Sequence, residues 1–187
     1  MYVKSEQVYV HSSIFRMNTG RDFRNRGAKK INTLKALIRI DMADQLVFHG
    51  SIRINAPASK VWAVLTNPKM TKKFMFGGEA ISDWVVGDPI IWRLEGTEKV
   101  LKGTIVAFEP GKRLSYTIID PDAPYPDVPQ NYTTVTYDLA EDSHQTTVSV
   151  SDGDFSVTAD GKKRYEKTVR GWGEALKKLK EVAEEQV

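Results

Sequence analysis

The side chains best suited to a chemical role are aromatic residues at alternate positions of strand-like segments. Trp92, Tyr116 and Tyr137 each follow such an alternation, and Trp172 belongs to a helical segment near the C-terminus. In this register the four side chains face one another across the interior of the fold. Aromatic walls with tyrosine hydroxyls can hold an apolar ligand and orient it. A plain hydrophobic core is the alternative, and both interpretations stay open.

The predicted ligand site includes further apolar side chains. Phe74, Phe76 and Trp84 are expected near the opening of the interior, and Leu176 follows Trp172 on one helix face. The full set of predicted ligand-binding residues is Phe74, Phe76, Trp84, Trp92, Tyr116, Tyr137, Trp172 and Leu176. A strand that slips by one residue turns every side chain to the other face, so this set depends on the register of each strand.

The sequence has no recognisable catalytic or metal-binding motif. His11, His49 and His144 are too far apart to show the spacing of metal ligands or of a proton relay. No Gly-x-Ser-x-Gly nucleophile motif occurs. The absence of cysteine excludes thiolate catalysis, disulfides and cysteine-based zinc sites. We therefore predict no catalytic residue, no metal and no cofactor.

Two clusters of charged residues each allow two interpretations. The proline-rich segment 120–129 carries hard-cation ligands in Asp120, Asp122 and Asp127, but it lacks the glycine and terminal glutamate of a calcium loop. Solvated carboxylates in an exposed loop are the favoured interpretation. The second cluster opens the C-terminal helix, where positive charge opposes the helix dipole, and consists of Lys162, Lys163, Arg164 and Lys167. A solvated helix face or an anionic partner would account for it.

Periodicity indicates the elements that position these residues. A first strand, 46–54, turns at Pro57 into a short helix, and Asn67-Pro68 starts a second short helix that reaches about Phe74. Alternating, strand-like segments follow at 80–85, 89–94, 100–108, 113–119, 134–139 and 148–150. The apolar spacing of one long helix face connects Tyr165, Val169, Trp172, Leu176, Leu179 and Ala183.

This order of elements predicts an α+β fold with a curved antiparallel sheet of about seven strands wrapped around a long C-terminal helix. Two short helices are expected between the first two strands. The motifs that carry a family resemblance are Ile54-x-Ala56-Pro57-x-x-x-Val61-Trp62, Trp84-x-x-Gly87-Asp88, Gly103-x-Ile105-x-x-Phe108-Glu109-Pro110, Val135-Thr136-Tyr137-x-Leu139 and Gly171-Trp172-x-x-x-Leu176. With them, residues 45–184 resemble the START-like helix-grip superfamily (SRPBCC), and within it the domain of the homologues of activators of the 90-kDa heat-shock-protein ATPase.

The resemblance implies a cavity between sheet and helix and three candidate functions. The first is a module that binds a small hydrophobic or amphipathic molecule, such as a lipid. The second is a stress-response protein that interacts with a chaperone; we rank it lower because the separate chaperone-binding domain of the eukaryotic activators is not recognisable here. The third is an enzyme of cyclase or hydrolase type, which needs a titratable group with a shifted pKa in the cavity. The predicted inward positions are instead aromatic or aliphatic.

The resemblance also predicts a difference at the mouth of the cavity. Members of the family often carry a tryptophan after the second short helix, where this chain has Phe74-Met75-Phe76.

Charge divides the chain into two parts. Residues 1–41 contain nine basic and three acidic residues, whereas residues 42–187 contain 18 basic and 21 acidic residues. The basic character therefore belongs to an N-terminal extension, residues 1–44, which we predict to be disordered or to precede the native start; a targeting or anionic-surface segment is the alternative. Residues 45–187 form the predicted START-like domain. We expect a cytoplasmic protein with no membrane span and no nucleic-acid partner, and the oligomeric state stays open.

Overall fold

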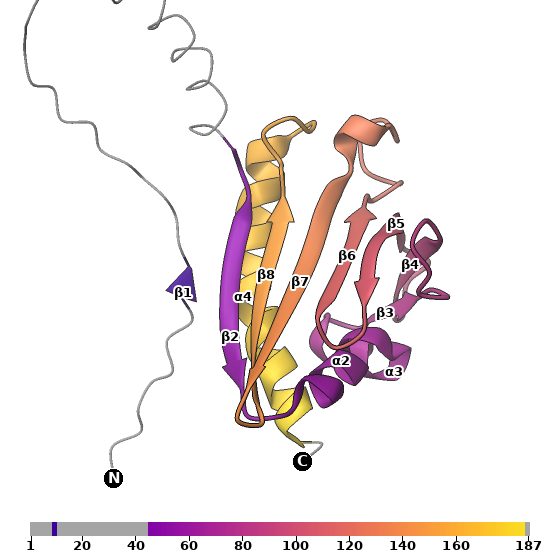
Figure 1. The fold of residues 1–187 in the computed structure, drawn as a ribbon. Helices are drawn as coiled ribbons and strands as arrows, with labels where there is room; N and C mark the ends of the chain where they lie inside the picture. The colour runs from indigo at the N-terminus through magenta and orange to yellow at the C-terminus, as the bar shows by residue number, and fades with distance from the viewer. Residues whose placement is uncertain (1–8, 11–44, 186–187) are drawn as a thin grey trace, which may run out of the picture.

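The computed structural model of this protein describes residues 9–10 and 45–185 (Figure 1). The predicted N-terminal extension, residues 1–44, lies outside the described residues except for positions 9 and 10. The elements in chain order are β1 (Tyr9–Val10), β2 (Phe48–Ile54), α2 (Ala58–Thr66), α3 (Pro68–Phe74), β3 (Gly78–Ile81), β4 (Pro89–Leu94), β5 (Val100–Glu109), β6 (Arg113–Ile118), η1 (Pro129–Asn131), β7 (Thr133–Asp142), β8 (Gln145–Gly153) and α4 (Gly161–Glu185).

The strands form one antiparallel sheet in the order β1-β2-β8-β7-β6-β5-β4-β3. The long helix α4 runs along one face of this sheet, and the short helices α2 and α3 lie at one end of it (Figure 1). Strands β2 to β8 are the seven predicted strands, and both short helices fall between β2 and β3. The predicted helix-grip fold is confirmed.

The two short helices begin where their capping residues predict. Helix α2 begins at Ala58, directly after Pro57, and the backbone N–H of Ala58 donates to Oε2 of Glu141 in β7 at 2.8 Å. Helix α3 has Pro68 at its first position, and the Asn67 side chain accepts from a backbone N–H of the first turn at 2.9 Å. Proline is tolerated at a helix start because its missing N–H would have no partner there.

The buried face of α4 has the spacing that the sequence predicts. Its buried side chains are Trp172, Ala175, Leu176, Leu179, Val182 and Ala183. The ring of Phe48 in β2 stacks on Trp172 with 6.0 Å between ring centroids, so the helix packs against the edge half of the sheet. Among the described helices, none has the uninterrupted apolar length that crossing a membrane would require.

Strands β5 and β6 approach each other closely at Gly103. A Cβ atom there would lie 1.6 Å from the backbone oxygen of Thr117. The next backbone N–H, of Thr104, donates to the Thr117 hydroxyl at 3.0 Å. The register of the strand pair then shifts between Ile105 and Ala107, as a β-bulge does. A bulge bends its strand, so this region contributes to the curvature that wraps the sheet around α4.

A candidate ligand cavity between the sheet and the final helix

The candidate functional site is a cavity of about 380 Å³ between α4 and the inner face of the sheet. One transverse row of the sheet lines it: Tyr116 of β6 pairs with Val135 of β7, which pairs with Asp152 of β8. Trp172 and Ala175 of α4 lie opposite this row. The volume falls within the range of small-molecule pockets, which is about 300–1,000 Å³.

The aromatic residues predicted to meet across the interior are in contact. The ring centroids are 6.0 Å apart for Trp92 and Tyr116, 6.5 Å for Tyr116 and Tyr137, and 5.6 Å for Tyr137 and Trp172. Of the predicted ligand-binding residues, Phe76, Tyr116 and Trp172 line the cavity. Trp92 and Tyr137 are buried behind this wall and hold its rings in place.

The other predicted site residues lie elsewhere. Phe74 and Leu176 are 1% and 0% exposed and belong to the hydrophobic core. Phe74 was expected near the opening, but as the last residue of α3 it points into the core, and Phe76, which is 49% exposed, lies at the cavity instead. Trp84 stacks on Phe108 with 5.7 Å between ring centroids and is not part of the cavity lining.

Asp152 is the titratable group that the sequence reasoning missed. Its carboxyl lines the cavity and is 8% exposed. The indole Nε1–H of Trp172 donates to Oδ2 at 3.0 Å, whereas Oδ1 is buried without a hydrogen-bond partner. Burial raises the pKa of this carboxyl to about 6, against the opposing effects of the Trp172 indole, the Thr133 side chain and the positive charge of Arg164. A carboxyl of this kind in a cavity can exchange a proton near neutral pH.

The signal that would have found Asp152 is the alternation of β8. Val148 and Val150 mark the inward positions of that strand, and the next inward position is 152. The sequence prediction followed this alternation only as far as Val150. The strand continues to Gly153, so its last inward side chain is a carboxyl.

Arg164 is a further charged residue of the cavity lining, and neighbouring groups hold its guanidinium in place. Nη2 donates to the backbone oxygen of Asn131 at 3.0 Å. The guanidinium carbon lies 4.7 Å from the ring centroid of Tyr125 and 5.5 Å from that of Phe155. Nη1 is buried without a hydrogen-bond partner. A solvated face was one interpretation of the basic start of α4. Arg164 does not belong to such a face, because its side chain turns toward the cavity.

The proline-rich loop 120–129 closes one side of the cavity through ion pairs. Asp120 pairs with Lys99 at 2.6 Å, and both residues line the cavity. Asp127 pairs with Lys102 and accepts from the Tyr132 hydroxyl at 2.8 Å. The predicted solvated carboxylates are therefore wrong for Asp120 and Asp127, which form ion pairs, whereas Asp122 is exposed. Within the described segments, no cluster of three or more histidine, aspartate or glutamate side chains could hold a metal ion.

Asn131, which is 5% exposed, joins this loop to the start of α4. Its side-chain amide donates to the oxygen of Pro126 at 2.8 Å, and its side-chain oxygen accepts from the N–H of Ala159 at 2.8 Å. With the bond from Arg164 to its backbone oxygen, one asparagine connects three segments around the cavity.

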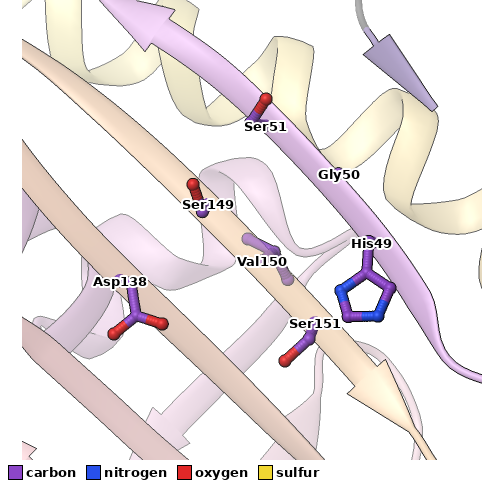
Figure 2. Close-up of a pocket in the computed structure, with 7 residues that line it drawn as sticks. All are labelled: His49, Gly50, Ser51, Asp138, Ser149, Val150 and Ser151. Atoms are coloured by element: carbon purple, nitrogen blue, oxygen red, sulfur yellow. The ribbon is translucent and has the colours of Figure 1, made fainter. Parts of the chain in front are cut away.

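A second hollow, of about 600 Å³, lies on the outer face of the sheet, away from α4 (Figure 2). His49, Ser149, Ser151 and Asp138 point into it from three adjacent strands, and His49 pairs directly with Ser151 across β2 and β8. Serine, histidine and aspartate are the residue types of a nucleophilic triad. Among the described residues, however, no hydrogen bond joins His49 to the serines or to Asp138, so this face has no relay.

The comparisons with known proteins agree with the fold. Residues 55–184 match the family model described as Activator of Hsp90 ATPase homolog 1-like protein. A solution structure of ChR145 from Cytophaga hutchinsonii is 31% identical, with a TM-score of 0.63, over 78% of this chain and 98% of that chain. No curated protein matches the chain significantly.

Two further solved structures share the fold. Protein MLL2253 from Mesorhizobium loti is 22% identical, with a TM-score of 0.64, over 75% of this chain and 98% of its own. The Aha1 dimer from Colwellia psychrerythraea is 21% identical, with a TM-score of 0.58, over 74% of this chain and 96% of that chain. Since the family model covers most of the described domain, the chain belongs to the family of Activator of Hsp90 ATPase homolog 1-like proteins, with a START-like helix-grip domain.

Proposed function

We propose that this protein binds a small hydrophobic or amphipathic molecule in the cavity between α4 and the sheet. The cavity itself is the observation that supports this function: about 380 Å³ with mainly aromatic and aliphatic walls and a few polar groups. Burial of apolar ligand surface is worth about 25 cal/mol per Å². Tyr116 contributes a hydroxyl to this wall, and burial together with the neighbouring Tyr137 raises the pKa of that hydroxyl well above its ordinary value.

Gly171 allows a direct test of this proposal. It lines the cavity, and a Cβ atom at this position would meet no atom within 4 Å. A leucine at position 171 therefore places its side chain in the cavity without a backbone clash. Gly173 is a matched control, because it also lies in α4 with nothing within 4 Å but does not line the cavity.

The expected result is a loss of probe binding in one variant only. The probe is N-phenyl-1-naphthylamine, whose fluorescence rises in apolar surroundings. Gly171→Leu should weaken its binding at least about tenfold because the side chain occupies the cavity, and Gly173→Leu should bind as the unchanged protein does. Thermal unfolding of both variants checks that the fold is kept. Equal binding by all three proteins would contradict the proposal.

A second candidate function is acid–base catalysis in the same cavity, and Asp152 is the observation that favours it. A catalytic carboxyl needs a pKa near the working pH and a place beside the substrate; the pKa of Asp152 is raised to about 6, and the residue belongs to the cavity lining. For a bound molecule that is converted, Asp152→Asn should abolish turnover while leaving binding intact. Native mass spectrometry of the gently purified protein, followed by extraction, would identify the molecule to be tested.

A further inference from the structure

This inference rests on the proposed function and concerns the chemistry of the bound molecule. Two polar atoms of the cavity-lining residues are buried and unpartnered: Oδ1 of Asp152 and Nη1 of Arg164. No ion pair joins the two side chains within the described segments, although the positive charge of Arg164 is near enough to lower the pKa of Asp152. An unmade hydrogen bond on a buried charged group is costly. An occupant that supplies an acceptor to Arg164 removes this cost, and an apolar occupant leaves it in place.

The balance of charge around the cavity favours an anion. The charged residues in the lining are Lys99, Asp120, Asp152, Arg164 and Lys167. Lys99 and Asp120 neutralise each other in an ion pair of 2.6 Å. Two cations then remain against the single carboxyl of Asp152. Both cations come from α4, where Lys167 follows Arg164 by three residues and therefore lies on the same side of the helix.

Arg164 is prepared for such a partner. The bond from Nη2 to the Asn131 backbone and the rings of Tyr125 and Phe155 hold the guanidinium, so little side-chain freedom is lost when a ligand binds. Arginine in a fixed orientation is the usual residue for recognition of carboxylates.

We propose that the cavity takes an amphipathic carboxylic acid whose carboxylate pairs with Nη1 of Arg164, with Lys167 beside it, and whose apolar body lies between Val135 and Ala175. The sequence allows two interpretations of the basic start of α4, a solvated face or an anionic partner. This proposal explains part of that cluster. Arg164 and Lys167 bind the anion, whereas the exposed Lys162 and Lys163 lie outside this cavity.

The test compares decanoate with 1-decanol as competitors of N-phenyl-1-naphthylamine. The two molecules share one apolar chain and differ in charge. Decanoate should displace the probe from the unchanged protein at a concentration about tenfold lower than 1-decanol. Arg164→Gln should reduce this preference to about one, and Lys167→Gln should reduce it several-fold. Lys163→Gln, which removes an equal charge outside the cavity, should leave the preference unchanged.

The outcomes separate this inference from the proposed function. If decanoate and 1-decanol displace the probe equally, and Gly171→Leu removes both, the cavity binds ligands and the anionic class is wrong. A failure of Gly171→Leu to affect probe binding overturns both proposals. Because the comparison of the two competitors uses the unchanged protein, it decides the matter even if Arg164→Gln does not fold. Lys167 is exposed, so its variant is expected to fold normally.

Discussion

Asp152→Asn is expected to raise the free energy of unfolding by about 2–3 kcal/mol at a pH of about 7.5. Burial raises the pKa of Asp152 from an ordinary value of 3.8 to about 6, so ionising this carboxyl costs more in the folded than in the unfolded chain. Asparagine has the same shape and keeps an oxygen for the Nε1–H of Trp172, but it carries no charge. Urea unfolding of both proteins measures the difference.

The stability gained by Asp152→Asn should depend on pH, and it should increase as the pH rises. Between pH 3.8 and about 6 the folded protein holds the Asp152 proton and the unfolded chain has lost it. The unchanged protein therefore loses stability, relative to the variant, as the pH rises through this window. Below the window both states are protonated and the difference should be small. Above the window the difference in stability should reach its full size and stay constant.

Asp138→Asn is the matched control, because its carboxylate lies on the outer face of the same sheet with 53% of the side chain exposed. It should change stability by less than about 0.5 kcal/mol and show no such window. A gain for Asp152→Asn that does not vary with pH would mean that the buried charge is not its cause. The expected gain also bears on function, since a stability cost at one buried carboxyl is typical of functional sites.

Gly103→Ala is expected to destabilise the protein by at least about 3 kcal/mol. The added Cβ would lie 1.6 Å from the backbone oxygen of Thr117, which belongs to the neighbouring strand and has no freedom to turn aside. Strands β5 and β6 would have to separate, which breaks the bond from Thr104 N–H to the Thr117 hydroxyl. Denaturant unfolding gives the magnitude.

Gly173→Ala is the control for this substitution. A Cβ there meets nothing within 4 Å, and alanine is the better helix former by about 1 kcal/mol, so this variant should gain stability. Both changes add one methyl group, which has no room at position 103 and open space at position 173. A loss below about 1 kcal/mol for Gly103→Ala would show that β5 and β6 can shift apart easily.

The fold could be predicted because local patterns and tertiary structure agree. Pro57 and Pro68 set the starts of the short helices, and the apolar spacing of α4 matches its buried face. The alternation of β6 and β7 placed Tyr116 and Tyr137 in the interior, where the structure has them. Such patterns depend on neighbours in sequence, so a single amino-acid sequence contains them.

The cavity was predictable only in part, because its polar groups break the patterns that revealed the rest. Asp152 interrupts an apolar alternation, and Arg164 belongs to a run of charges that is normally solvated. Both are inside because partners distant in sequence hold them: Trp172 for the first and Asn131 for the second. Phe74 and Phe76 differ by two positions, yet only the second lies at the cavity, since the chain leaves α3 between them.

The pairing of β2 with β8 has a consequence for biosynthesis. Ile54 pairs with Thr146, so the first long strand of the domain has its partner near the other end of the chain. As the chain leaves the ribosome, β2 has neither β8 nor α4 to cover its inner face. Sheets closed by such distant pairs fold slowly, because a long loop must be ordered before the contacts form. We therefore expect this domain to complete its folding only after translation has delivered its final helix.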